Sequence, residues 1–226
     1  AFGQGFQQSI WTRLINSNDQ NFMAEYYPNP FFDQVTFRFT NMSDEIITID
    51  IFDVAGRRIP SYFWSQYAAD GQSFFEFGRE RIRTDTEIKS YYKNWHVAEK
   101  NSNFVGAFFG FIIDNPYPEI DYENELEFWI PFRELEMLAS GTWLLQVISI
   151  LPEYRGKNYA KDLLRNAEEV ARGHGAKKIT LQVEEVNILA MKTYLTNGYQ
   201  EVGRRELVPF PFSNDTGDIV LMEKSI

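Results

Sequence analysis

The sequence contains no cysteine among its 226 residues and only two histidines, His96 and His174. Without cysteine there can be no disulfide, no cysteine-ligated metal and no thiolate nucleophile, and two distant histidines make no metal cluster. No apolar run approaches the roughly 20 residues that span a bilayer, and no basic stretch followed by an apolar core begins the sequence. We therefore expect no metal, no membrane partner and, by default, a cytoplasmic location.

Positive charge is also scarce. Acidic residues outnumber basic ones by 32 to 22, which gives a net charge of −10 at pH 7. This balance argues against nucleic acid as a partner. It suits a cationic ligand such as an amine, although an acidic surface is more often simply a soluble one. With 44% hydrophobic residues, the chain can bury the core of one domain with an appendage.

The most informative stretch is LPEYRGKNYA at 151–160, a short basic turn that contains glycine. The residues before it, 142–150, are apolar and β-branched enough for a buried strand, and apolar residues recur at helical spacing after it. A turn between a strand and a helix presents the unpaired N–H groups and the positive dipole end of the helix to a ligand. The sequence therefore predicts an anion site. Neither G-x-x-x-x-G-K-S/T nor G-x-G-x-x-G is present at this point, so two common phosphate loops are excluded.

This turn resembles the pyrophosphate-binding pattern of the GNAT superfamily of acyl-CoA-dependent N-acyltransferases. That pattern is Gln or Arg, two residues, Gly, one residue, then Gly or Ala; here Arg155, Asn158 and Ala160 occupy the defined positions. Asn158 departs from the pattern, because the middle position is usually glycine. Asparagine adopts left-handed backbone more readily than most residues, so we expect the turn to form.

A second family pattern, N-x-x-A-x-x-x-Y-x-x-x-G-F/Y, matches residues 187–199 without a gap. Asn187 is typical of a helix N-cap, and Gly198 is typical of the residue that ends a helix in left-handed backbone. The segment between the two patterns alternates apolar and polar residues at 179–183, as a strand does. Residues 142–206 are thus identified as a member of this superfamily.

The resemblance implies an α/β (α+β) GNAT fold, with a central mixed, mostly antiparallel sheet of about seven strands flanked by helices and splayed at the central parallel pair. We expect residues 35–226 to form this domain. Residues 1–34, with a short apolar helix at 6–15, are expected to be an extension packed on it or on a second subunit, so a homodimer is one open arrangement. A hairpin at 95–113 and helices at 60–69, 73–82 and 134–138 follow from local patterns.

The resemblance also implies the chemistry, which is transfer of an acetyl group from acetyl-CoA to an amine of a small molecule or peptide in a ternary complex. Tyr194 matches the family's general acid. The general base stays open, with Glu184 and Glu185 as candidates by position. The acidic insertion at 114–141 is expected to influence acceptor choice. The residues implied to hold the cofactor are Ile148, Ser149, Ile150, Arg155, Gly156, Lys157, Asn158, Tyr159, Ala160 and Asn187.

Three points remain open at this level. Residues 47–56 fit a strand by β-branched alternation and a helix by the resemblance, and we follow the resemblance to a first helix that ends at Gly56. A non-catalytic acyl-CoA binder or interaction protein is the alternative function, motivated by Asn158. Residues 27–59 also resemble a β-sandwich secretion-sorting module, which we rank last because such modules close a chain.

Overall fold

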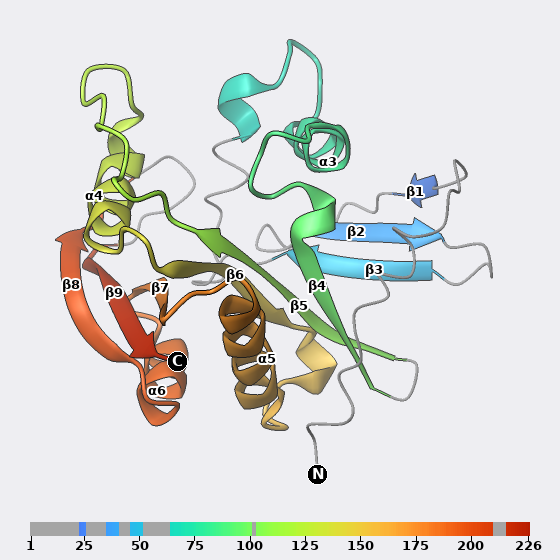
Figure 1. The fold of residues 1–226 in the computed structure, drawn as a ribbon. Coiled ribbons are helices and arrows are strands. Elements are labelled where there is room, and N and C mark those ends of the chain that lie inside the picture. Colours follow the sequence, from blue (N-terminus) through green and yellow to red (C-terminus); the bar gives the residue numbers. More distant parts are fainter. Residues whose placement is uncertain (1–22, 26–34, 41–45, 52–63, 101–102, 210–215) are drawn as a thin grey trace. The chain divides into compact units, whose positions relative to one another are not determined.

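The computed structural model (Figure 1) describes residues 23–25, 35–40, 46–51, 64–100, 103–209 and 216–226. The chain divides into two compact units. The first contains residues 1–109 and 147–163, and the second contains residues 110–146 and 164–226. The predicted helix at 6–15 and residues 52–56 of the predicted first helix lie outside the described residues.

A three-stranded antiparallel sheet lies within the first unit. It consists of β1 (Met23–Glu25), β2 (Val35–Thr40) and β3 (Ile46–Ile51). In β2 and β3, Val35 pairs with Ile51 and Thr40 with Ile46. The helix predicted to end at Gly56 is therefore wrong over 46–51. Isoleucine and threonine lose rotamer freedom in a helix and pack well on a pleated surface, so local propensity decides this segment.

A second sheet is mixed, as the resemblance implied. It has six strands, one fewer than the seven or so that were expected. The hydrogen-bonded order is β4-β5-β6-β7-β9-β8. β6 and β7 are parallel, whereas β4 and β5, β7 and β9, and β9 and β8 are antiparallel. The strands are β4 (Trp95–Lys100), β5 (Asn103–Ile112), β6 (Trp143–Ile150), β7 (Lys178–Glu184), β8 (Gln200–Glu206) and β9 (Asp218–Ser225).

The described helices are α3 (Phe74–Thr84), α4 (Ile130–Leu138), α5 (Tyr159–Gly173) and α6 (Ile188–Thr196), with short 3₁₀ turns η1 (Tyr92–Asn94), η2 (Glu127–Trp129) and η3 (Pro152–Tyr154). Residues 64–67 are also helical, within the segment expected at 60–69. Helix α3 covers most of the segment expected at 73–82; Ser73 is its N-cap residue, although the Ser73 side chain makes no cap bond. Helix α4 begins before the predicted residue 134, because Pro131 suits the first turn of a helix. No helix in the described ranges has the length and apolarity to cross a membrane.

The second unit has a dense apolar core on both sides of β7. Its side chains are almost fully buried, and the largest are Leu135, Trp143, Leu144, Leu145, Leu164, Ile179, Leu181, Tyr199, Ile219, Leu221 and Met222. A Cβ at Gly110 would collide with the Leu144 carbonyl oxygen and the Trp143 ring. Glycine at this position therefore allows β5 to pass close to β6, which fixes the strand that leads to the predicted anion turn.

Candidate active site

The parallel pairing of β6 with β7 is short. In the second unit, the two strands pair at Trp143–Ile179 and Leu144–Thr180, although β6 continues to Ile150. In the first unit, the chain after β6 stays with β5, because the N–H of Leu151 donates to the Val105 carbonyl at 2.9 Å. A Cβ at Gly106 would collide with the Ser149 carbonyl oxygen, so β5 approaches this end of β6 closely as well. The parallel strands β6 and β7 therefore pair only near their first residues, as expected for a central pair that splays apart.

The predicted anion turn lies between η3 and α5 in the first unit. Gly156 and Asn158 both have left-handed backbone, with φ of 73° and 64°. Asn158 is the sole residue other than glycine with positive φ in the described part of the chain. The expectation that asparagine tolerates this conformation is therefore confirmed. The side chains at positions 155–158 are exposed.

The turn offers an anion several donors. In the described residues, no intramolecular acceptor is found for the backbone N–H groups of Gly156, Lys157 and Asn158. The Asn158 carbonyl accepts from the N–H of Lys161 at 3.2 Å, which starts α5. Arg155 Nε donates to the Ile150 carbonyl at 3.2 Å, so this side chain folds back toward the end of β6. Exposed N–H groups at a helix N-terminus, flanked by cations, are suited to a pyrophosphate.

Substitutions at position 158 should show the importance of the left-handed backbone. We expect Asn158→Gly to keep acyl-CoA affinity within about threefold, because glycine adopts φ of 64° without strain. We expect Asn158→Val to weaken binding about tenfold, because a β-branched residue with positive φ costs about 1–2 kcal/mol. Calorimetric titration with acetyl-CoA measures both. Equal affinities for the two variants would show that the turn's conformation does not matter for binding.

The second family pattern forms the predicted helix α6 in the second unit. Asn187 Oδ1 accepts the N–H of Ala190 at 3.2 Å, so Asn187 is the N-cap, as expected. Gly198 has φ of 89° and follows the end of the helix. The Tyr194 side chain is buried, with 4% of its surface exposed, and its ring lies 5.9 Å from that of Tyr199.

A buried charge cluster lies beside these two tyrosines. The hydroxyl of Tyr199 contacts Glu168 Oε1 at 3.5 Å, and Lys224 Nζ donates to the same oxygen at 2.7 Å. Burial raises the pKa of Tyr199 well above its usual value, and the negative charge of Glu168 raises it further. Tyr199 therefore stays a neutral phenol at physiological pH.

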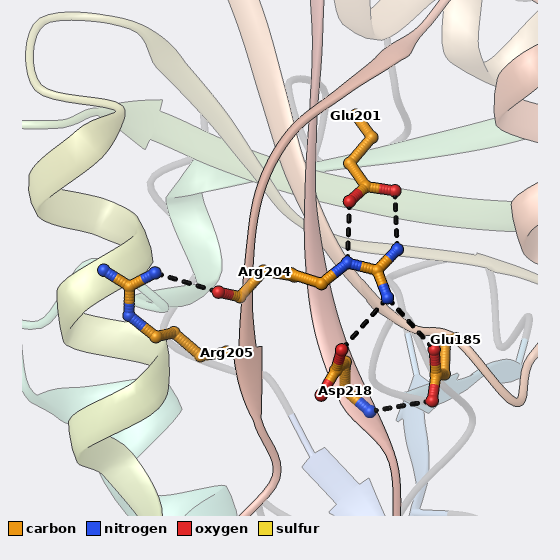
Figure 2. A network of polar contacts seen from close by, with 5 residues as sticks. All are labelled: Glu185, Glu201, Arg204, Arg205 and Asp218. Carbon is orange, nitrogen blue, oxygen red and sulfur yellow. Dashed lines mark hydrogen bonds and ion pairs between the residues drawn. The ribbon is translucent and has the colours of Figure 1, made fainter.

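The two candidate bases have different surroundings. Glu184 is the last residue of β7, and only 3% of its surface is exposed. Glu185 is half-buried and bound on both oxygens, with Arg204 Nη1 at 3.3 Å and the backbone N–H of Asp218 at 3.1 Å (Figure 2). Arg204 also holds Glu201 with two bonds of 2.8 Å and Asp218 at 3.0 Å. The Glu185 carboxylate thus joins the end of β7 to β8 and β9.

The predicted site residues are shared between the two units. Residues 148–150 and the turn at 155–160 lie in the first unit, whereas Glu184, Glu185, Asn187 and Tyr194 lie in the second. The sequence did not point to Arg204 or Glu168, although Glu201 and Arg204 are three residues apart with opposite charge. No group of three or more potential metal ligands occurs in the described ranges.

Two family models match the chain. The acetyltransferase (GNAT) family model matches residues 59–199, more than half of the sequence. A model of a secretion system C-terminal sorting domain matches residues 25–71. The second match contains β2, β3 and the last residue of β1, Glu25. It crosses the boundary expected between residues 34 and 35. That boundary and a homodimer both remain predictions.

The expected cytoplasmic location is wrong. The sorting-domain match points to secretion. The expectation rested on the lack of a basic stretch followed by an apolar core, and that pattern carries no information about a sorting domain. The β-module resemblance at 27–59, which was ranked last, is the one that this match supports.

Individual proteins also resemble the chain. N-acetyltransferase 8F1 of Rattus norvegicus is 28% identical over 147 residues, which is 62% of this chain; the match spans 57% of that relative's length. Among solved structures, spermidine N-acetyltransferase from Vibrio cholerae in complex with CoA and spermine shares 20% identity, with a TM-score of 0.46 over 76% of this chain and 85% of that one. A Bacillus subtilis acetyltransferase in complex with CoA shares 13% identity, with a TM-score of 0.44 over 65% and 88% of the two chains.

Proposed function

Because the chain belongs to the GNAT acetyltransferase family, we propose that it transfers an acetyl group from acetyl-CoA to an amine of a small molecule or peptide. The observation that carries this proposal is the turn at 155–158. Its two left-handed residues leave N–H groups available at the start of α5, which is the arrangement that binds a pyrophosphate.

Most of the proposed binding groups belong to the first unit. The turn from Arg155 to Ala160 binds the pyrophosphate through its backbone, with Arg155 and Lys157 adding charge. The edge of β6 at 148–150 that faces away from β5 binds the pantetheine arm through main-chain atoms, in the manner of an added strand. Asn187, which caps α6, also contacts the cofactor. These assignments need no metal ion.

The reaction is direct attack in a ternary complex. The neutral amine nitrogen forms a bond to the thioester carbonyl carbon, the C–S bond then breaks, and the thiolate takes a proton from the Tyr194 hydroxyl. Glu184 accepts the proton that the amine loses. Positioning of the two substrates supplies much of the acceleration, and a phenol suits the role of acid because its ordinary pKa lies near 10.

A pair of isosteric variants separates the two carboxylates. We expect Glu184→Gln to lower the acetylation rate about tenfold at pH 7, because the amine then lacks a base. The rate should recover as the pH rises and the amine loses its proton in solution. We expect Glu185→Gln to change the rate less than threefold, because its oxygens hold Arg204 and the N–H of Asp218. Thiol release measured between pH 6 and 10 reports both effects. Equal rate losses for the two variants would contradict the assignment of Glu184 as the general base.

The second candidate function is a non-catalytic acyl-CoA binder. The observation in its favour is Asn158, since its side chain stands where the family pattern has glycine. A thiol-release assay over a panel of primary amines and polyamines separates the two functions. Binding of acetyl-CoA without release on any amine would favour the binder.

A further inference from the structure

The loop between β7 and α6 joins two parts of the proposed site within the second unit. It follows Glu184, the last residue of β7, and leads into α6, which is capped by Asn187 and carries Tyr194. The N–H of Glu185 donates to the Asp218 carbonyl at 2.9 Å, and the N–H of Asn187 donates to the Glu184 carbonyl at 2.9 Å. Contacts that fix this loop therefore also fix the carboxylate before it and the helix after it.

The Glu185 side chain closes the end of the antiparallel ladder between β7 and β9. The last pair of that ladder is Glu184 with Ile219. At the next position, the N–H of Asp218 donates to Glu185 Oε1 at 3.1 Å. A side-chain oxygen thus accepts the bond that a main-chain carbonyl accepts in an ordinary antiparallel pair. The carboxylate of Glu185 therefore holds the loop to the start of β9.

Gly217, the residue before Asp218, is suited to this contact. It has φ of 118°, which glycine adopts without strain. A Cβ at this position would lie 2.7 Å from Glu185 Oε1, so any other side chain would displace the carboxylate. The Gly217 carbonyl accepts the N–H of Leu207 at 2.8 Å, which ties it to the residue after β8. Main-chain geometry, and not charge alone, defines the place of the Glu185 carboxylate.

Arg204 of β8 joins this carboxylate to two others (Figure 2). Its Nη1 donates to Glu185 Oε2 at 3.3 Å and to Asp218 Oδ2 at 3.0 Å, and its Nε and Nη2 hold both oxygens of Glu201. Among the described residues, no other cation forms an ion pair with these three carboxylates. Without Arg204, the carboxylates of Glu185 and Asp218, which now share one nitrogen, would repel each other.

We infer that Arg204 is a positioning residue for the proposed acetyl transfer, which acts through Glu185 to hold Glu184 in place. The inference rests on the proposed function, because it takes Glu184 as the general base. A base must lie within hydrogen-bond reach of the proton that it accepts, and a displacement of about 1 Å can lower a rate by about 10². An exposed ion pair contributes little to global stability, so the main effect of Arg204 is on the rate and on local opening of the loop.

Arg204→Met removes the guanidinium and keeps a long side chain. We expect it to lower kcat for thiol release about tenfold at pH 7, with recovery at higher pH as for Glu184→Gln. The KM for acetyl-CoA should change less than about threefold, because most of the proposed binding groups belong to the first unit. Arg204→Lys keeps a cation beside Glu185 and Asp218 and should stay within about threefold of the unmodified rate.

Glu185→Gln has a smaller expected effect for a physical reason. The amide oxygen of glutamine still accepts the N–H of Asp218. The substitution also removes one of the three negative charges around Arg204, which keeps its bonds to Asp218 and Glu201. The loop therefore stays in place.

A double variant shows whether Arg204 acts through Glu184. If it does, Arg204→Met should lower the rate less than about twofold in a chain that already carries Glu184→Gln, because no base remains to be positioned. Independent effects would instead multiply to a loss of about a hundredfold.

Lys178→Met is the matched control. Lys178 Nζ donates to Glu223 Oε1 at 2.7 Å, so this exposed lysine also bridges β7 and β9. It is the first residue of β7, and a strand rise of about 3.3 Å per residue places it roughly 20 Å from Glu184. Lys178→Met should leave the rate and its pH profile unchanged. The melting temperatures of the ligand-free variants show whether each remains folded.

Amide hydrogen exchange reports on the loop without any substrate. The N–H groups of Glu185 and Asp218 should exchange about tenfold faster in Arg204→Met, because their shared contacts open more often. They should exchange at the unmodified rate in Lys178→Met. A loss of rate in Arg204→Met without faster exchange at these two groups would contradict the positioning role.

The rate measurements distinguish failure of the inference from failure of the proposed function. If the unmodified chain releases no thiol with any amine, the proposed function is wrong and the positioning role is wrong with it. If it releases thiol but Arg204→Met keeps the full rate, the proposed function stands and the positioning role is wrong. The same is true if the losses multiply in the double variant, or if Lys178→Met reproduces the loss.

Discussion

Acetyl-CoA at about 100 times its dissociation constant should raise the melting temperature of this protein by roughly 5 to 10 °C. A ligand that binds only the folded state stabilises it at this concentration by about 2.7 kcal/mol. For a chain of this length, each kcal/mol moves the midpoint by about 2 to 4 °C. Thermal melts monitored by fluorescence measure the shift. Every catalytic assignment depends on this binding.

Truncated ligands and a double variant show which groups are responsible. Pantetheine lacks the pyrophosphate and should give almost no shift. Replacing both Arg155 and Lys157 by alanine should lower the shift only in part, because the N–H groups of the turn and the helix dipole remain. A flat thermal response to acetyl-CoA, confirmed by calorimetry at millimolar ligand, would contradict both the enzyme and the acyl-CoA binder.

The sequence-based predictions were most accurate where a structural feature depends on neighbouring residues and also belongs to a family pattern. Asn158 was expected to tolerate left-handed backbone in the turn, and it has positive φ, as does Gly156. Asn187 was expected as an N-cap, and its side chain makes the capping bond. These features depend on neighbours within four residues, so the sequence contains most of the information. The order of elements from residue 142 to residue 206 is confirmed for the same reason.

The sequence predicted less well where contacts are distant or two patterns compete. Residues 46–51 were assigned to a helix against their own β-branched composition, and they form a strand. Glu184 and Glu185 are adjacent and could not be distinguished by position. Their difference arises from Arg204 and Asp218, which are far away in the sequence but close in the folded second unit.

The two family matches together raise the question of where this chain would obtain acyl-CoA. The sorting-domain match at 25–71 points to secretion, and the GNAT match at 59–199 indicates a reaction that uses acyl-CoA. The two matches overlap at residues 59–71. A chain with both matches needs a source of acyl-CoA wherever it acts. Detection of acetylated amines in the culture medium and in the cell contents would show where that source is.

Tyr194→Phe should lower turnover by about 10² or more while acetyl-CoA affinity stays nearly unchanged. The substitution removes one hydroxyl and keeps the ring, which is buried and packs beside Tyr199. A general acid contributes about 10² to 10⁴ in rate, and the departing thiolate has no other proton donor in the proposed mechanism. Steady-state rates of thiol release, with affinity measured separately by calorimetry, give the two numbers.

Tyr199→Phe is the matched control for this prediction. Tyr199 is equally buried and lies beside the same ring, but its hydroxyl contacts Glu168 and its pKa is raised well above the usual value by burial. Removing that hydroxyl should therefore leave turnover within about threefold, with a loss of stability of about 1 kcal/mol for a buried hydrogen bond. If Tyr194→Phe also leaves turnover unchanged, Tyr194 is a core aromatic and the acid must be sought elsewhere. If both variants lose turnover equally, the loss reflects the packing of the tyrosine pair and not proton donation by Tyr194.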